Sequence, residues 1–277
     1  MLESCRKPRL RAENAAPPTA SPYTVTVTRA HEDVRRAQRL RHEVFAGELG
    51  AVLPHGDEGL DIDEFDEWCD HVTVRHEATG DIVGTCRVLL PERAAEFGRC
   101  YAESEFDLTS LMPLRERLVE TGRSCVRADH RNGTVFALLW GGLARHLERT
   151  GHAASWLAGC VSVPLDDDGV SIAAAWELAR AGHQAPPSYG VTPIVPWPVH
   201  DGERRRDETT AVRAVPGRAT AVQGTVPPLL RWYLRMGGWV CGPPAWDADF
   251  KVADLFVLLS PDRIDRRYWD FFAAGAD

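Results

Sequence analysis

Two ionisable side chains stand three positions apart inside a short stretch that otherwise has the pattern of a β-strand. Residues 118–126, LVETGRSCV, are partly alternating and β-permissive, and they include Glu120 and Arg123. A charge inside a sheet is costly unless it is paired or used in chemistry. A spacing of three puts the two side chains on opposite faces of a regular strand. Gly122 lies between them and favours a β-bulge, which would turn both to one side. An edge strand with one solvated charge on each face is the alternative.

The next residues predict a turn followed by a helix. Residues 129–133 are polar and end in Asn-Gly, and residues 134–147 carry apolar side chains at helical spacing. A helix begins with backbone N–H groups that have no partner within the helix, at the positive end of its dipole. Such a start can bind an anion. The residues expected at this anion site are Arg131, Asn132, Gly133 and Thr134.

Several runs of residues, in the right order, resemble the ornithine N-acyltransferases. These are GNAT-superfamily enzymes that use acyl-ACP and form lyso-ornithine lipid, and they are related to the acyl-homoserine-lactone synthases. The resemblance covers roughly residues 38–260. The runs that carry it are RHEVF (41–45), GTCR (84–87), YAESEFDL (101–108), ETGRSCV (120–126), ALLWGGLARHL (137–147) and RMGGWVCGPP (235–244).

The resemblance implies an α/β fold of the GNAT type, with a central mixed twisted sheet, helices on both faces and two central strands that splay apart. The diverging strands would be 118–126 and 153–163. A polar tail at 1–22 is expected to be disordered. Residues 23–277 would then form one acyltransferase domain, with a partly irregular, Pro-rich insertion at about 184–226.

The resemblance also suggests roles for individual side chains. Glu120 is the candidate general base, acting directly or through a water, and Arg123 the second catalytic candidate. Arg41 belongs to the family's R-x-x-V-F run and is expected to bind substrate. Arg87 lies inside the apolar run 82–90, so a structural ion pair with a carboxylate is the alternative to a functional role.

Residues 57–70 hold eight carboxylates and no Lys or Arg. Asp61, Asp63 and Asp66 resemble the acidic trio of the homoserine-lactone synthases, although Asp61 replaces a Glu and that family's upstream tryptophan has no match near 49–52. A dense carboxylate run attracts a cationic acceptor such as a diamino acid. We expect Asp63 and Asp66 to bind that cation or to brace the arginines. A solvated acidic loop is the alternative, whereas a Ca²⁺ loop lacks its turn Gly and distal Glu.

The expected reaction moves a fatty acyl group from a thioester to the amine of an amino acid, with ornithine as the first candidate. The co-substrate would be an acyl-phosphopantetheine thioester on acyl carrier protein (ACP) or CoA; no tightly bound cofactor and no metal are expected. Arg131-Asn-Gly-Thr departs from the R/Q-x-x-G-x-G/A loop of acetyl-CoA-using members, which leaves the carrier open. An acidic ACP would need a basic patch for docking. The candidate patches are Arg35, Arg36 and Arg39, or Arg145 and Arg149.

Composition narrows the class of protein. A net charge of −8 argues against non-specific nucleic-acid binding. No apolar run approaches the length of a membrane span, so we expect a cytoplasmic protein, with peripheral contact to the inner face of the membrane through the lipid product as an addition. Seven Cys without a CxxC motif indicate reduced thiols, and a nucleophilic Cys125 has no evident His partner. A homoserine-lactone-type synthase, another GNAT acyltransferase, a pore-forming hemolysin and a non-catalytic binding module are the rival hypotheses.

Overall fold

The computed structural model describes residues 21–198 and 226–264. The predicted tail therefore lies almost wholly outside the described residues, as does most of the predicted irregular insertion. Residues 184–198, the described beginning of that insertion, are hydrogen-bonded to the body of the protein: Ala185 N–H donates to Val240 O over 3.0 Å, and Val191 N–H to Cys241 O over 2.8 Å.

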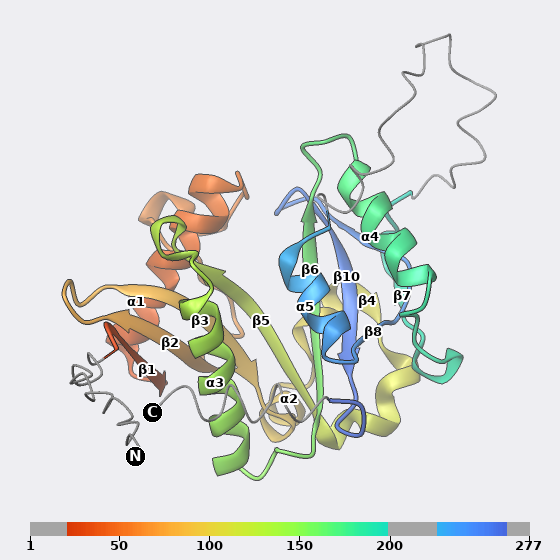
Figure 1. Ribbon diagram of the computed structural model, residues 1–277, viewed down its shortest axis with the longest axis horizontal. Coiled ribbons are helices and arrows are strands. Elements are labelled where there is room, and N and C mark those ends of the chain that lie inside the picture. The colour runs from red at the N-terminus through yellow and green to blue at the C-terminus, as the bar shows by residue number, and fades with distance from the viewer. Residues whose placement is uncertain (1–20, 199–225, 265–277) are drawn as a thin grey trace, which may run out of the picture.

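A mixed sheet of eight strands organises the described part of the chain, with the order β1-β2-β3-β5-β6-β10-β8 and with β9 paired to β10 (Figure 1). All neighbouring pairs are antiparallel except β5 and β6. A two-stranded sheet of β4 (Phe106–Asp107) and β7 (Thr192–Pro193) lies beside it. The strands of the main sheet are β1 (Tyr23–Thr28), β2 (Asp70–His76), β3 (Ile82–Leu89), β5 (Leu118–Val126), β6 (Trp156–Pro164), β8 (Trp239–Val240), β9 (Ala245–Asp247) and β10 (Val252–Leu259).

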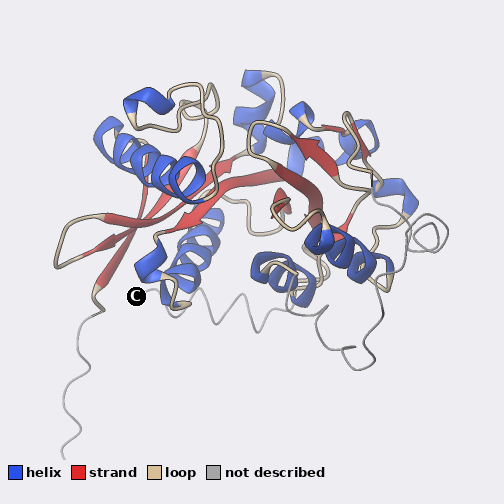
Figure 2. Ribbon diagram, turned by 90° about the horizontal axis from the view of Figure 1, so that it is seen from above, coloured by secondary structure: helices blue, strands red, loops and turns tan. Residues whose placement is uncertain are grey.

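Helices cover both faces of the sheet, as the family resemblance implied (Figure 2). One face carries α3 (Thr134–Arg149), α4 (Val170–Arg180) and α5 (Pro228–Arg235), which share a core with the sheet. The other face carries α1, α2 and most of the short helical turns. These elements are α1 (His31–His42), the π-helix η1 (Glu43–Glu48), α2 (Pro91–Phe97) and the 3₁₀ turns η2 (Gly56–Glu58), η3 (Tyr101–Ser104), η4 (Thr109–Arg117), η5 (Ala128–His130) and η6 (Pro187–Tyr189).

Helix α3 lies unusually close to the sheet because its sequence provides a glycine where the two touch. A Cβ atom on Gly142 would lie 2.6 Å from Val25 Cγ1 and 2.9 Å from Val72 Cγ1, too close for any larger residue. The apolar stripe predicted for this helix is buried, with Val135, Leu143 and Leu147 at most 3% exposed. This packing fixes the start of α3 next to the end of β5.

The two central strands diverge, as expected. Strands β5 and β6 are paired only from Leu118–Trp156 to Glu120–Ala158 and then separate into a V (Figure 1). Gly159 permits the last close approach, because a Cβ there would be 2.7 Å from the carbonyl oxygen of Thr121. Beyond this point β6 keeps β10 on its other side, so its backbone groups facing β5 are open to an extended ligand.

Candidate active site

Strand β5 contains the β-bulge that the Glu-x-Gly-Arg spacing predicted. Thr85 of β3 pairs with Cys125 and Arg87 with Gly122, so Arg123 and Ser124 together oppose the single residue Cys86. Arg123 adopts the left-handed conformation with φ of 49°. For a residue with a side chain this conformation costs on the order of 1–3 kcal/mol and persists only when its surroundings impose it. The surroundings that impose it are an ion-pair network and two aromatic rings.

Three arginines and three aspartates alternate in a buried network below the bulge. Its arginines come from α1, β3 and β5, and its aspartates from the acidic loop between η2 and β2. Arg41 meets Asp61 over 2.9 Å and Asp66 over 2.7 Å. The remaining contacts are Arg87 with Asp63 and with Asp66 (3.1 Å), and Arg123 with Asp61 (3.2 Å) and Asp63 (3.3 Å). The six charges sum to zero, which is the condition under which buried charges are tolerated.

The network bears on three residues expected to bind substrate, for two of which, Arg87 and Asp66, an ion pair was the alternative. Arg41 is 0%, Arg87 3% and Asp66 7% exposed, and none of them lines a cavity described below. Burial alone would raise the pKa of Asp66, but hydrogen bonds and charge from Arg41 and the charge of Arg87 hold it well below its usual range. This geometry favours a bracing role for all three, Arg41 included. For Asp63 and Arg123, which do line a cavity, both roles are compatible with the geometry.

An open cavity of about 310 Å³ lies over the bulge, on the same face of the sheet as α1. Arg123 stands in its wall between two rings, with the guanidinium carbon 4.8 Å from the Tyr101 ring centre and 4.4 Å from that of Phe250. Its Nη1 donates a hydrogen bond to Tyr101 Oη over 2.9 Å. The acidic residues in the wall are Asp61, Asp63, Glu105, Asp247 and Asp249. The wall thus carries more carboxylates than cations, and its potential favours a cationic ligand.

Glu120 occupies the last paired position before β5 and β6 separate. Its two carboxylate oxygens accept the backbone N–H groups of Tyr101 (2.6 Å) and Ala102 (2.8 Å) at the start of η3. Burial raises its pKa, although both N–H groups favour the charged form. The side chain is 5% exposed and does not line the acidic cavity. Glu120 and Arg123 therefore both contact Tyr101, Glu120 at its backbone N–H and Arg123 at its hydroxyl, but only Arg123 lines the cavity.

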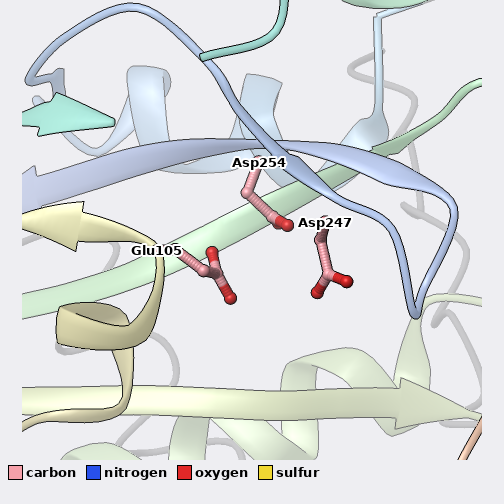
Figure 3. A group of neighbouring side chains, drawn as sticks. All are labelled: Glu105, Asp247 and Asp254. Carbon is pink, nitrogen blue, oxygen red and sulfur yellow. The ribbon is translucent and has the colours of Figure 1, made fainter. Parts of the chain in front are cut away.

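Sequence reasoning missed three carboxylates beside this cavity. Glu105 precedes β4, Asp247 ends β9 and Asp254 lies in β10, and their side chains point into one gap between β10 and β5 (Figure 3). Within the described residues, these three offer oxygens that all lie within 4.8 Å of one another. A signal existed for Asp254, because it is a single charge in the otherwise apolar strand VADLFVLL. Glu105 lies in a run that the resemblance had marked without a role.

A second, larger cavity of about 540 Å³ lies on the opposite face of β5, between α3 and α5. Ser124, the neighbour of Arg123 in the bulge, lines this cavity, so adjacent residues of β5 line the two cavities. Its lining runs from the start of α3 to aromatic side chains deeper inside. The residues concerned include Arg131, Gly133, Phe136, Trp140, Leu143, Trp232 and Tyr233. A mostly apolar cavity of this size fits a small molecule or a long alkyl group.

The predicted anion site lies at the mouth of the larger cavity. Arg131 and Gly133 line it, and Gly133 has a φ of 86° at the turn into α3. Asn132 Oδ1 accepts the Thr134 N–H over 3.0 Å, so that donor is already used. Arg131 is paired with Glu48 over 2.6 Å. An anion bound here would therefore contact the N–H groups of the first turn that follow Thr134, and the Arg131 side chain, whose charge is partly neutralised by Glu48.

Cys125 does not have the surroundings of a nucleophile. It is buried, and burial raises the pKa of its thiol, which keeps it protonated.

The described residues include no helix that could cross a membrane.

Comparison with known proteins agrees with the geometry. A model of the GNAT acetyltransferase domain matches residues 40–141. The chain is 33% identical over 258 residues to an L-ornithine N(alpha)-acyltransferase of Rhodobacter capsulatus, covering 90% of this chain and 94% of the relative. It is 29% identical to the protein of the same name from Brucella abortus, with 91% and 89% covered.

Solved structures give a weaker likeness. A CoA-dependent acyl-homoserine lactone synthase with MTA has a TM-score of 0.49 at 14% identity, covering 91% of this chain and 88% of that one. An N-acyl amino acid synthase from uncultured soil microbes has a TM-score of 0.41 at 8% identity, with 87% and 94% covered. Both scores are below 0.5, so neither bears on the chemistry. The family follows instead from the length and identity of the matches to curated proteins. This chain is a GNAT-type N-acyltransferase and belongs to the L-ornithine N(alpha)-acyltransferase family.

Proposed function

We propose that the protein transfers a fatty acyl group from an acyl-phosphopantetheine thioester to the α-amine of ornithine, giving a product of the lyso-ornithine-lipid type. The names of the relatives suggest the acceptor. The observation that carries the proposal is the acidic cavity over the bulge, where carboxylates outnumber cations. Such a cavity suits an acceptor with two ammonium groups better than a neutral amino acid.

The chemistry requires a neutral amine beside an activated carbonyl. The amine nitrogen attacks the thioester carbon, the C–N bond forms, the C–S bond breaks, and the thiolate leaves with a proton. Because the thioester is already activated, no covalent enzyme intermediate is needed, and positioning with proton transfer supplies the catalysis. Glu120 is the proposed proton acceptor, through a water, because it stands where β5 and β6 separate and its pKa is raised. Arg123 would orient the acceptor beside it.

The larger cavity is the proposed donor site. Its mouth at the start of α3 would receive the pantetheine phosphate, through first-turn N–H groups and the Arg131 side chain. The arm would pass along the open edge of β6, and the alkyl chain would pack against the apolar wall formed by α3 and α5. In this arrangement donor and acceptor approach β5 from opposite faces and meet at the V.

An acyl carrier protein is the proposed carrier. Arg36, Arg39 and Arg127 line a surface hollow beside the turn between β2 and β3, near the start of α3. Glu43 and Asp81 line the same hollow, so the surplus of positive charge is small. Arg145 and Arg149, the other candidate patch, lie in the second half of α3, away from the cavity mouth. We therefore favour docking on the α1 side.

The test is direct. Purified protein is incubated with acyl-ACP or acyl-CoA and an amino-acid panel, and products are identified by mass spectrometry together with thiol release. We expect Nα-acylornithine and an equivalent amount of free thiol. No acylated ornithine with either donor, or an equal yield with neutral amino acids such as glycine, would refute the proposed function.

A further inference from the structure

Glu105, Asp247 and Asp254 form a group of carboxylates that differs from every aspartate of the ion-pair network. Each network aspartate contacts at least one guanidinium. Within residues 21–198 and 226–264, no Arg, Lys or His makes an ion pair with any of the three carboxylates. Three oxygens from three separate elements nevertheless lie within 4.8 Å of one another. Mutual repulsion of this kind is costly in a folded protein unless the carboxyl groups take up protons or a cation lies in the gap.

A second observation points to a ligand. The Glu105 carboxylate faces the thiol of Cys160, a weak hydrogen-bond donor. Its Oε2 is closed off from solvent and has no hydrogen-bond partner among the described residues, and the side chain points into the gap between the three carboxylates (Figure 3). A buried polar atom without a partner is rare in folded proteins and calls for an explanation. Asp254 is 2% exposed, and its carboxylate accepts the Ser162 hydroxyl over 2.7 Å. Asp247 accepts the backbone N–H groups of Asp249 and Phe250, which hold it in place.

The titration behaviour agrees with a missing positive charge. Burial, then the charge of Asp247, raises the pKa of Asp254 to about 7, against the hydrogen bond from Ser162. Burial, then the charges of Asp254 and Asp247, raises the pKa of Glu105 well above its ordinary value. The other ionisable groups that face the pair are Arg123 and Cys160, and neither neutralises it. A cation placed among the three carboxylates would remove the repulsion.

We infer that Glu105, Asp247 and Asp254 hold the distal ammonium group of a diamino-acid acceptor, the amine that is not acylated. The inference rests on the proposed function and names the part of the site that selects the acceptor. An alkylammonium has three N–H donors and no acceptor, which matches one hydrogen bond to each of three carboxylates. Mg²⁺ or Ca²⁺ would need three or more further oxygen ligands, from water or substrate, beside these three.

The distal ammonium fits better than the reacting one. An amine must lose its proton before it attacks a thioester carbon, whereas three carboxylates without a counter-charge favour the protonated form. A group held here would stay an ammonium and would not react. Removal of the proton from the α-amine therefore falls to Glu120, which is separate from this group.

The experiment compares ornithine with norvaline, which has the same carbon chain and lacks the distal amine. The variants are Glu105→Gln, Asp247→Asn and Asp254→Asn. Matched controls are Glu116→Gln and Asp57→Asn, two exposed positions outside both cavities. A charge-assisted hydrogen bond of ordinary strength corresponds to a change of about 10- to 100-fold. We expect each site variant to lower the ratio of kcat/KM for ornithine to that for norvaline by about this factor, and both controls to behave like wild type.

Each other outcome overturns a different statement. If the wild type acylates ornithine and the ratio is unchanged in all three variants, the inference is wrong and the proposed function stands. Equal loss on both substrates in variants that melt at or above the wild-type temperature would identify a base or a structural role in place of selectivity. Activity that is lost with EDTA and restored by a divalent ion would identify a metal site. A wild type that does not acylate ornithine would remove the proposed function and the inference together. Asp247→Asn, at the half-buried position, guards against failure of the buried variants to fold.

Discussion

Replacing Asp254 by Asn should stabilise the protein, and the gain should appear only as the pH rises. The pKa of Asp254 is raised from its ordinary 3.8 to about 7, because the carboxylate is buried and Asp247 repels it. Between these two values the folded state holds a proton that the unfolded chain releases. The free energy of unfolding therefore falls as the pH increases from about 4 to about 7, and it stays at the lower level above that. An Asn cannot ionise and avoids this loss.

The size of the effect follows from the shift. Each pKa unit corresponds to about 1.4 kcal/mol, so complete loss amounts to about 4 kcal/mol at pH 8. Repulsion between Glu105 and Asp247 persists in the variant, and Asn Oδ1 can still accept the hydrogen bond from Ser162. We expect a gain of about 2–4 kcal/mol at pH 8 and almost none at pH 4, or roughly 5–10 °C in Tm for a chain of this size.

Thermal unfolding followed by circular dichroism at several pH values, without acceptor, measures the gain. The matched control is Asp63→Asn. Burial alone would raise the pKa of Asp63, but the charges of Arg87 and Arg123 lower it, so its ionised form stabilises the fold above its ordinary pKa. The Asp63→Asn substitution should therefore lower Tm at pH 8. A variant at Asp254 that is less stable than wild type at pH 8, or whose gain is the same at pH 4, would refute the account of an uncompensated carboxylate.

Three further changes test other parts of the site. Glu120→Gln should lower kcat by about 10²–10⁴ on ornithine and norvaline alike; a loss confined to ornithine, measured as thiol release, would contradict its role as base. Arg41→Met leaves two buried aspartates without this cation and should cost about 3–5 kcal/mol in denaturant unfolding; a neutral result would mean that the network reorganises. Reversing Arg36 and Arg39 to Glu should raise KM for acyl-ACP, with little effect on acyl-CoA, and should weaken its salt dependence; equal effects on both donors would place the damage in the donor cavity.

The sequence predicted most elements because their signals are local. Alternation indicated β1 and helical spacing indicated α3, and both lie close to the expected residues. Apolar side chains at helical spacing over 31–49 favour one continuous helix. In the structure α1 ends at His42 and the chain continues as a π-helix. Bounds of this kind depend on the packing of the next segment, which no local pattern contains.

Arg41, Asp63 and Asp66 were expected in the site from the family resemblance and the acidic run 57–70, and Arg131 to Thr134 from the start of a helix. For Glu120, Arg123 and Arg87 the argument was that a charge in an apolar strand must be paired or have a function. Applied to Glu120, Gly122 and Arg123, it predicted the bulge, which the structure confirms. Applied to Arg87, it left a functional role and an ion pair open, and the structure contains the ion pair. The same argument was not applied to Asp254, although its strand is equally apolar.

What the sequence determined by itself is the inventory: which stretches are strands and helices, where charges interrupt them, and to which family the motifs are similar. Only the tertiary structure decided which charges neutralise one another. Arg41 meets Asp66 across 25 positions of the chain, while Glu105, just before β4, and Asp254, in β10, come together without an ion-pair partner among the described residues. Spacing along the chain cannot distinguish a carboxylate that braces an arginine from one left for a ligand, because the distinction depends on which strands the sheet brings together.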